Sequence, residues 1–368
     1  MDALPTHMVA VHLTGHGGLE KLEYRDDVPL PRPAAGEVLI RVGAAGVNNT
    51  DINTRLGWYS KVVKEGTNSV GEAGTNPIND DDATWSGTPM TFPRIQGADC
   101  CGRIVAVGDG VSSARLGDRV IVKNMLRSYV AHRPYECWTF GSECDGAFAQ
   151  YTKAPAREVY PVICSWSDAE LASIPCAYST AENMLHRANV SAGETVLITG
   201  ASGGVGSAAV QLARRRGAEV IATTSTSKAA AIMALGAHRI VSRDADPLEV
   251  VGPRQVDVVL DIVGGEMSAQ RIETLKAGGR YAVAGAIAGP LINLDLRAIY
   301  LRDLTVFGCT FQEDAVFENL VSYIERDEIR PLVSQVYPLS SISEAQQDFL
   351  NKGFVGKLVL TPPQEQNR

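Results

Sequence analysis

A run of small residues between a predicted strand and a predicted helix constrains the fold of this chain more than any other feature. The run is Gly200-Ala-Ser-Gly-Gly-Val-Gly206, and it lies between the apolar stretch 195–199 and the helical stretch 207–216. In a β-α unit, backbone N–H groups of such a turn and the helix N-terminus can hold a pyrophosphate. The alternative is a tight turn without a ligand, which would cost folding entropy without a reason. The residues expected to contact a dinucleotide here are Ser202, Gly203, Gly204, Val205 and Gly206.

The region around this turn alternates between strand-like and helix-like stretches. The predicted strands are 195–199, 220–224, 239–242, 257–261 and 279–285, and the predicted helices are 207–216, 228–235 and one through 275. Continuous apolar strands that alternate with helices indicate a parallel sheet covered on both faces. The predicted fold class is therefore α/β, with a doubly wound parallel-sheet domain. Ligands bind at the carboxyl ends of such strands. Further cofactor contacts, mainly through backbone atoms, are expected from Gly285, Ala286, Ile287, Phe307 and Cys309.

The first part of the chain has a different pattern of predicted elements and is predicted to be rich in short strands. Its predicted strands are 7–13, 38–43, 102–108 and 119–123. The segment from 60 to 93 shows no sustained periodicity and is expected to be a long loop or lid. The tail has a predicted helix at 315–326 and a final strand at 357–360, and we expect it to rejoin the first domain. A length of 368 residues favours two domains over one.

Composition excludes several function classes. The net charge is −8 and no basic block occurs, so nucleic acid and anionic membranes are poor partners. No window reaches about 18 apolar residues and no leader peptide is evident, which indicates a cytoplasmic protein. Seven cysteines without a CxxC pair exclude a disulfide framework and ordinary four-cysteine zinc spacing.

The residues beyond the second predicted strand bear on the choice of cofactor. An acidic residue here would accept hydrogen bonds from a ribose 2′-hydroxyl, but the sequence has Thr223-Thr-Ser-Thr-Ser-Lys228. Hydroxyls and one ammonium suit a 2′-phosphate, so Ser225 and Lys228 favour NADPH over NADH. Ser227 could instead cap the next helix while Lys228 points into water, and both readings can hold together.

Several motifs together resemble the medium-chain dehydrogenase/reductase superfamily, and within it the zinc-independent quinone oxidoreductase and enone reductase branch. Outside the glycine turn, the motifs are Gly36-Glu-Val-Leu-Ile-Arg-Val42, Gly46-Val-Asn-Asn-Thr-Asp51, Gly97-Ala-Asp-Cys-Cys-Gly102, Val105-Ala-Val-Gly108 and Gly117-Asp-Arg-Val120. The resemblance covers nearly the whole chain except 60–92 and roughly 124–146. It is specific for the superfamily and not for the substrate.

The resemblance implies a domain organisation and an assembly. It implies a β-rich GroES-like catalytic domain at 1–165, completed by 309–368, and a Rossmann NADPH-binding domain at 166–308. The nicotinamide would lie in the cleft between them. It also implies a homodimer in which the strand near 304–308 pairs with its symmetry mate.

The resemblance also bears on metal. Zinc enzymes of the superfamily hold the catalytic ion with two cysteines and a histidine, and the matching positions look like Asn48, Ala98 and Cys176. Asn and Ala cannot replace a thiolate and an imidazole, and Asp99 beside one cysteine falls short of three protein ligands. The lobe that holds structural zinc has only Cys137 and Cys144. No functional metal is therefore expected.

Without a Lewis acid, the natural hydride acceptor is a quinone or an activated C=C bond of a small molecule. The resemblance points to Tyr59, within Gly57-Trp-Tyr-Ser60, as a proton donor, although it could simply pack under the lid. It points to Asn48 as a donor to a substrate oxygen, although it could be a turn residue. Thr180 matches a position that touches the cofactor, although its hydroxyl could bond back to the preceding helical turn.

Other functions stay open at this point. An enoyl-thioester reductase is the nearest alternative to a quinone or enone reductase. A zinc-dependent alcohol dehydrogenase could recruit metal through Asp99, Cys176 and a further ligand. A non-catalytic NADPH-binding sensor or structural protein is the third alternative.

Overall fold

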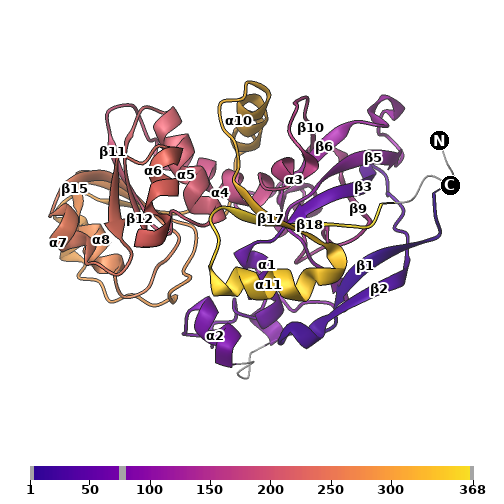
Figure 1. The fold of residues 1–368 in the computed structure, drawn as a ribbon, viewed down its shortest axis with the longest axis horizontal. Helices are drawn as coiled ribbons and strands as arrows, with labels where there is room; N and C mark the ends of the chain where they lie inside the picture. Colours follow the sequence, from indigo (N-terminus) through magenta and orange to yellow (C-terminus); the bar gives the residue numbers. More distant parts are fainter. Residues whose placement is uncertain (1–3, 74–79, 365–368) are drawn as a thin grey trace.

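Two large sheets organise the chain. The computed structural model describes residues 4–73 and 80–364. Figure 1 shows one sheet at each end of an elongated molecule, with α4 and α10 between them. Both chain ends lie at the same end of the molecule, beside β1, β2 and β5.

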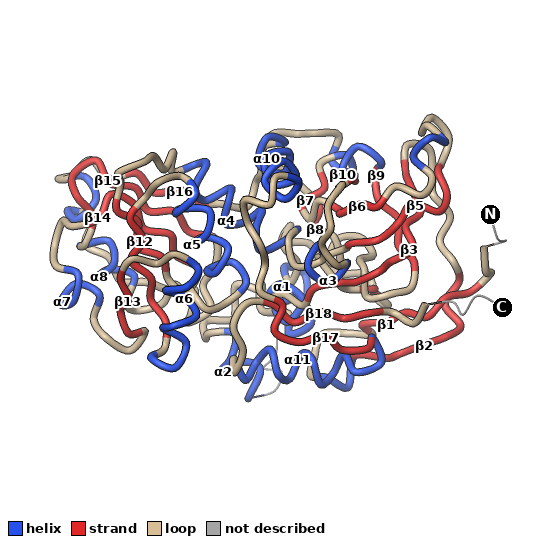
Figure 2. The backbone as a smooth tube through the Cα atoms, turned by 45° about the horizontal axis from the view of Figure 1, so that its top comes forward, coloured by secondary structure: helices blue, strands red, loops and turns tan. Residues whose placement is uncertain are grey.

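Six parallel strands form the first sheet, in the order β13-β12-β11-β14-β15-β16. They are β11 (Thr195–Ile198), β12 (Glu219–Thr224), β13 (Arg239–Ser242), β14 (Val256–Asp261), β15 (Leu275–Val283) and β16 (Thr305–Gly308). The helices around them are α4 (Pro175–Arg187), α5 (Gly204–Arg215), α6 (Ala229–Leu235), α7 (Pro247–Val251), α8 (Ser268–Glu273) and α9 (Arg297–Tyr300). They cover both faces of the sheet (Figure 2). This confirms the predicted doubly wound α/β fold, and the strand order reverses at β11, where such folds bind ligands.

A seven-stranded sheet forms the other half, in the order β10-β6-β5-β3-β18-β17, with β9 also paired to β3. Its strands are β3 (Glu37–Gly46), β5 (Cys101–Val107), β6 (Arg119–Val122), β9 (Tyr151–Pro155), β10 (Val159–Pro161), β17 (Val333–Pro338) and β18 (Lys357–Thr361). Smaller sheets are formed by β1 (His7–Leu13), β2 (Leu22–Pro29) and β4 (Arg94–Ile95), and by β7 (Met125–Leu126) and β8 (Trp138–Thr139). The helices here are α1 (Asn49–Leu56), α2 (Thr67–Ala73), α3 (Asp168–Leu171), α10 (Asp314–Glu325) and α11 (Ile342–Asn351).

The tail of the chain returns to the first half, as expected. In β18, Val359 and Leu360 pair antiparallel with Gly46 and Ala45 of β3. Figure 1 shows β17 and β18 beside β3, with α11 beneath them. Sequence analysis predicted α10 and β18 but not β17 or α11.

The segment from 60 to 93 is not wholly a loop, which corrects the prediction. It contains α2 and a 3₁₀ turn at Asp80–Asp82. Val70 of α2 is buried in a small cluster with Ile52 and Leu56 of α1. Tertiary packing thus stabilises a short helix that has no sustained periodicity of its own.

The helix predicted to run through 275 ends earlier, and the strand predicted at 279–285 begins earlier. Helix α8 ends at Glu273, and β15 starts at Leu275, which is fully buried and pairs with Val256 of β14. The register shifts between Val256 and Val258. Such an irregularity disrupts the local pattern that sequence analysis uses.

Candidate functional site

The glycine turn leaves the N-terminus of α5 open. Gly203 is the N-cap, no side chain caps it, and the first turn has no acidic residue. Gly200 has a φ of +58°, and a Cβ at Gly206 would lie 2.2 Å from the carbonyl oxygen of Gly200. The helix therefore starts against bare backbone, and no side chain caps the N–H groups at its positive dipole end. This cradle fits the pyrophosphate of a dinucleotide.

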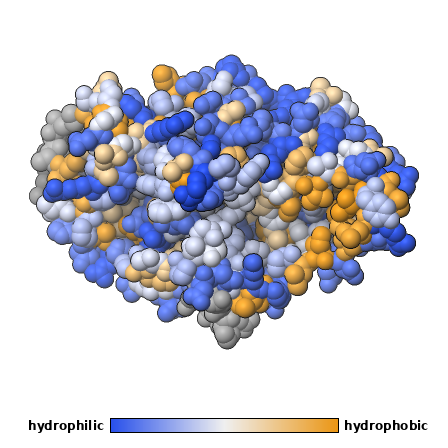
Figure 3. All heavy atoms as spheres, turned by 180° about the vertical axis from the view of Figure 1, so that it is seen from behind, coloured by the Kyte–Doolittle hydropathy of each residue, from blue (hydrophilic) through white to orange (hydrophobic). Residues whose placement is uncertain are grey.

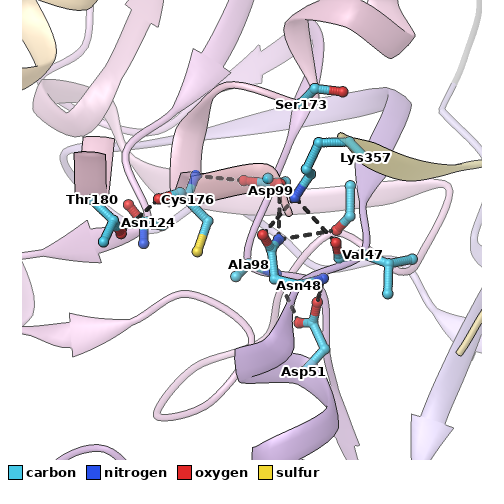
Figure 4. A network of polar contacts seen from close by, with 12 residues as sticks. Val47, Asn48, Asp51, Ala98, Asp99, Asn124, Ser173, Cys176, Thr180 and Lys357 are labelled. Carbon is cyan, nitrogen blue, oxygen red and sulfur yellow. Dashed lines mark hydrogen bonds and ion pairs between the residues drawn. The ribbon is translucent and has the colours of Figure 1, made fainter. Parts of the chain in front are cut away.

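A buried lysine from the tail lies against this turn. Gly356 N–H donates to the carbonyl of Ser202 at 2.9 Å, and a Cβ on Gly204 would lie 2.7 Å from Lys357 Cδ. Lys357 is 3 % exposed. Its Nζ donates to Asp99 Oδ2 at 2.8 Å and to Asn48 Oδ1 at 2.5 Å. Figure 4 shows the ammonium between these two side chains.

Asp99 and Asn48 complete this network. Asp99 accepts the Cys176 N–H at 2.6 Å through Oδ1, and it accepts Asn48 Nδ2 at 2.8 Å through Oδ2. The second amide hydrogen of Asn48 has an acceptor in the Gly46 carbonyl at 3.3 Å. All the hydrogen-bonding groups of the Asn48 side chain thus have partners within the protein. Its role as a donor to substrate stays a prediction, while its contacts here hold Asp99 and Lys357 in place.

The same asparagine starts α1. Asn48 and Asp51 form a capping box, in which Asp51 Oδ2 accepts the Asn48 N–H at 2.8 Å. Asp51 Oδ1 accepts the Ala98 N–H at 3.2 Å. Burial, with the nearby Asp99 carboxylate, raises the pKa of Asp51 to about 7. This box sets the entry angle of α1 and so places the side chains of its first turn.

The hydroxyl of Thr50, in that first turn, accepts hydrogen bonds from two side chains. Tyr59 Oη donates to Thr50 Oγ1 at 3.1 Å, and the Trp85 indole Nε1 donates to the same oxygen at 2.6 Å. The Tyr59 and Trp85 rings lie 5.0 Å apart. Burial raises the pKa of Tyr59, so its phenol stays protonated. Because Thr50 accepts two bonds and no acceptor for its own hydrogen occurs among the described residues, that hydrogen is available to a ligand.

Sequence analysis predicted Tyr59 but missed Thr50 and Trp85. Thr50 lies within the motif 46–51 that carried the resemblance, so a hydroxyl in the first turn of that helix was the available signal. Trp85 had no signal, because it comes from the segment that departs from the family pattern.

Thr180 and Cys176 lie on the first turns of α4. The Thr180 hydroxyl donates to the Cys176 carbonyl at 2.7 Å, which leaves its oxygen free to accept. Burial raises the pKa of the Cys176 thiol, so the thiolate is disfavoured. Figure 4 shows the Cys176 sulfur pointing away from Asp99, whose carboxylate meets the Cys176 backbone instead.

The other predicted cofactor contacts lie after β15 and around the end of β16. Cys309 is buried, and its N–H donates to Val283 at 2.9 Å, while Phe307 is half-buried. The Ile287 carbonyl accepts the Thr67 N–H at 3.0 Å. The segment 60–92 therefore contacts the loop after β15, which contains the predicted residues Gly285, Ala286 and Ile287.

A cluster of cations lies at the carboxyl ends of β12 and β13. Ser225 follows β12, and Lys228 Nζ donates to the carbonyl of Lys352 at 2.5 Å. Burial, and then the charge of Arg243, lowers the pKa of Lys228. Burial, and then Lys228, lowers the pKa of Lys352 to about 7. The two lysines have lowered pKa values beside further positive charge, and no acidic partner of either occurs among the described residues, which suits an anionic ligand.

Sequence analysis named Ser225 and Lys228 but missed Arg243 and Lys352. Arg243 follows β13, and its N–H donates to Thr224 at 3.0 Å. Lys352 follows α11 and comes from the other half of the molecule. Only the return of the tail brings it here.

Neither a metal cluster nor a membrane span was found where the structure is described. Residues 4–73 and 80–364 include no group of three or more His, Cys, Asp or Glu side chains that could hold an ion. None of their helices is long and apolar enough to cross a membrane.

Comparisons with known proteins agree with this architecture. A family model described as an alcohol dehydrogenase GroES-like domain matches residues 34–163. A second family model, described as a zinc-binding dehydrogenase, matches residues 204–326.

Relatives match along nearly the whole chain. The acryloyl-coenzyme A reductase of Metallosphaera sedula is 30% identical over 365 residues, covering 96% of this chain and 100% of the relative. The quinone oxidoreductase of Rattus norvegicus is 27% identical, covering 96% and 97%. A crystal structure from Sinorhizobium meliloti 1021, described only provisionally as an alcohol dehydrogenase, is 46% identical with a TM-score of 0.87 and covers 99% of both chains. The chain therefore belongs to the medium-chain dehydrogenase/reductase superfamily, and it is an oxidoreductase of that nicotinamide-dependent type.

Proposed function

We propose that this protein is an NADPH-dependent, metal-independent reductase of quinones or α,β-unsaturated carbonyl compounds. The observation that carries the proposal is the position of the Lys357 ammonium. It lies beside Asp99 and Asn48 and supplies the positive charge there, so these residues need no metal cation. When bound, the reduced nicotinamide supplies a hydride to the acceptor. The chain's own groups must then bind the cofactor, orient the acceptor and supply a proton.

The residues beside Cys176 do not fit a catalytic zinc. Asn48 donates both amide hydrogens, Ala98 has no ligand atom, and the pKa of the Cys176 thiol is raised. Asp99 already accepts from Lys357, Asn48 and the Cys176 N–H. A cation placed among these groups would have to displace an ammonium and would meet one thiol, which falls short of the three ligands a catalytic zinc needs. A carbonyl therefore has no Lewis acid to polarise it, which favours an activated C=C bond or a quinone as acceptor.

The hydroxyl pair near α1 supplies the proton in this proposal. Hydride addition to the β-carbon of an enone moves the electron pair of the C=C bond toward the carbonyl oxygen. Thr50, whose hydrogen has no acceptor among the described residues, donates to that oxygen, and Tyr59 donates to Thr50. The resulting enol tautomerises to the ketone as the oxygen loses its proton and the α-carbon takes one up, and solvent returns a proton to Tyr59. Enone, reduced cofactor and one proton thus give saturated ketone and oxidised cofactor. Donors placed where charge develops stabilise the transition state.

The cation cluster supports NADPH over NADH. Lys228, Arg243 and Lys352 lie at the carboxyl end of the sheet, next to the hydroxyls of residues 223–227. A 2′-phosphate would relieve the repulsion between these cations, whereas a ribose 2′-hydroxyl would leave it.

The free edge of β16 supports a homodimer. In the six-stranded sheet β16 is an edge strand, and Val306 on it is 48% exposed. Figure 3 shows an apolar patch over the end of the molecule that carries this sheet. Exposed apolar side chains of this region are Leu291, Ile292, Leu296, Tyr300, Leu301 and Val306. Pairing of two such edges would cover both the backbone groups and the patch.

An enoyl-thioester reductase is the second candidate, because one relative is an acryloyl-coenzyme A reductase. The hydride and proton steps would be the same for a thioester. The two candidates differ only in what lies beyond the reacting C=C bond.

The direct test follows the oxidation of NADPH with but-3-en-2-one, 1,4-benzoquinone and crotonyl-coenzyme A, with and without a chelator. We expect turnover of the enone or the quinone that the chelator leaves unchanged. Thr50→Val should lower kcat for the enone about 100-fold, and Tyr59→Phe about tenfold. Thr50→Ser should restore most of the activity, and Thr14→Val, at the exposed residue directly after β1, is the control. Turnover that requires added zinc, or full activity in Thr50→Val, would refute the proposal.

A further inference from the structure

A second feature of the structure is a pocket that shares Trp85 with the hydrogen bonds at Thr50. The pocket has a volume of about 740 Å³ and is lined mainly by two segments that depart from the family pattern, 60–92 and 124–146, together with Arg94 and Thr310. Its volume lies within the range of small-molecule sites. We name it the Trp85 pocket, after the lining residue that also contacts Thr50.

Two lining residues join the Trp85 pocket to the proposed reaction centre. Trp85 lines it and donates through Nε1 to Thr50 Oγ1 at 2.6 Å. Thr310 also lines it, directly after Cys309 at the end of the six-stranded sheet. Trp85 therefore belongs both to this pocket and to the hydrogen bonds at Thr50.

Three aromatic side chains are present in the otherwise mostly polar lining of the Trp85 pocket. Trp85, Tyr135 and Trp138 line it, with Met90 as a polarisable neighbour. The Tyr135 ring packs against the Phe311 ring in a tilted arrangement with centroids 5.3 Å apart, which ties the 124–146 segment to the residue after Thr310. Tyr135 is 77% exposed, so it forms the rim. Aromatic walls and a thioether favour a flat apolar group.

The charged side chains that line the pocket each have a partner, although Arg94 Nε has none in the part of the chain that the structure describes. Arg94 pairs with Asp145 at 2.9 Å, and Arg133 pairs with Glu136 at 2.5 Å. Glu143 accepts the N–H groups of Ser86 and Thr139. The described lining therefore offers no unpaired cation for the phosphates of a coenzyme A thioester, which need charge-assisted hydrogen bonds.

One hydroxyl of the lining, that of Ser142, has no hydrogen-bond partner among the described residues. Ser142 is 2% exposed. A buried hydroxyl without a partner costs free energy, which a polar atom of a ligand would offset. The hydroxyls of Thr84, Ser86 and Thr88, in contrast, bond to one another.

We propose that the Trp85 pocket binds an uncharged aromatic substituent of the substrate, so that the enzyme acts preferentially on aryl-substituted enones. The inference rests on the proposed function and names its substrate class. It places the aryl group between Trp85, Trp138 and the rim residue Tyr135, with the enone oxygen at Thr50.

The test compares kcat/KM for 4-phenylbut-3-en-2-one, but-3-en-2-one and crotonyl-coenzyme A with NADPH. For wild type we expect about a tenfold preference or more for the phenyl enone over the small enone. Tyr135→Ala should lower kcat/KM for the phenyl enone about fivefold, and Thr88→Trp, which fills the pocket from its exposed side, about tenfold or more. Both variants should leave the small enone within about twofold. Tyr24→Ala, another exposed tyrosine on β2, is the matched control.

The outcomes separate this inference from the proposed function. Equal kcat/KM for the two enones in wild type, or equal losses for both in the variants, would overturn the inference while the reductase function stands. A preference for crotonyl-coenzyme A would do the same. If no substrate turns over, titration calorimetry of 4-phenylbutan-2-one with the NADP⁺-loaded protein still tests whether the pocket binds the aryl group. Binding that Tyr135→Ala weakens and Tyr24→Ala preserves supports the pocket, and binding that neither variant changes overturns it.

Discussion

At the scale of single residues, Lys352 makes a prediction about pH. Its pKa is lowered to about 7 by burial and by Lys228, so the free side chain loses its proton between about pH 6 and 8. A 2′-phosphate favours the charged form, and binding above pH 7 must therefore take up a proton. The affinity for NADPH should fall about tenfold from pH 7 to pH 9, while that for NADH stays nearly constant. Calorimetric titrations in buffers of different ionisation enthalpy measure both the affinity and the proton uptake.

Two variants make this test specific to Lys352. Lys352→Met should weaken NADPH binding at pH 7 and remove its pH dependence, because the group that titrates is gone. Lys276→Met, a lysine paired with Asp257 far from the cluster, should leave both properties unchanged. Parallel pH curves for NADPH and NADH in the wild type would contradict this assignment.

At the scale of elements, the junction of β11 and α5 predicts how the glycine turn tolerates side chains. A Cβ on Gly206 would lie 2.2 Å from the Gly200 carbonyl oxygen, which is backbone and cannot move aside. Gly206→Ala should therefore lower the free energy of unfolding by about 1–3 kcal/mol. A Cβ on Gly203 meets nothing closer than 3.6 Å, so Gly203→Ala should keep the stability. Denaturant titration of both variants measures the difference.

The same two glycine variants test whether the pyrophosphate of the cofactor binds at this turn. Gly203 is the N-cap of α5, at the open helix end, so an added methyl group should weaken NADPH binding even though the fold is unchanged. Unchanged stability together with unchanged affinity in Gly203→Ala would place the pyrophosphate elsewhere.

At the scale of the whole molecule, the free edge of β16 predicts the assembly. Light scattering coupled to size-exclusion chromatography should give twice the chain mass for the wild type. Val306→Lys should give the single-chain mass, because a charge at the centre of the joined edges would be buried without a partner. Val336, 46% exposed on the edge strand β17 of the other sheet, offers the matched control Val336→Lys. Dissociation by the Val336 variant alone would place the interface at β17.

The sequence by itself determined the features that contiguous residues carry. The strand, turn and helix from 195 to 216 were predictable because their pattern is local and their chemistry is that of the backbone. The order of the following strands and helices was predictable for the same reason. The short helix α2 and the early start of β15 were not, since each depends on packing against a distant segment.

Only the tertiary structure decided the composition of the site. Lys357 meets Asp99 and Asn48 across 258 and 309 positions of sequence, and Lys352 reaches Lys228 across 124. Trp85 reaches Thr50 from a segment without periodicity. No local pattern encodes such contacts, because they depend on how the tail pairs with β3 and how Trp85 packs against α1. The sequence thus specified where a dinucleotide could rest, and the folded chain decided which side chains would surround its reactive end.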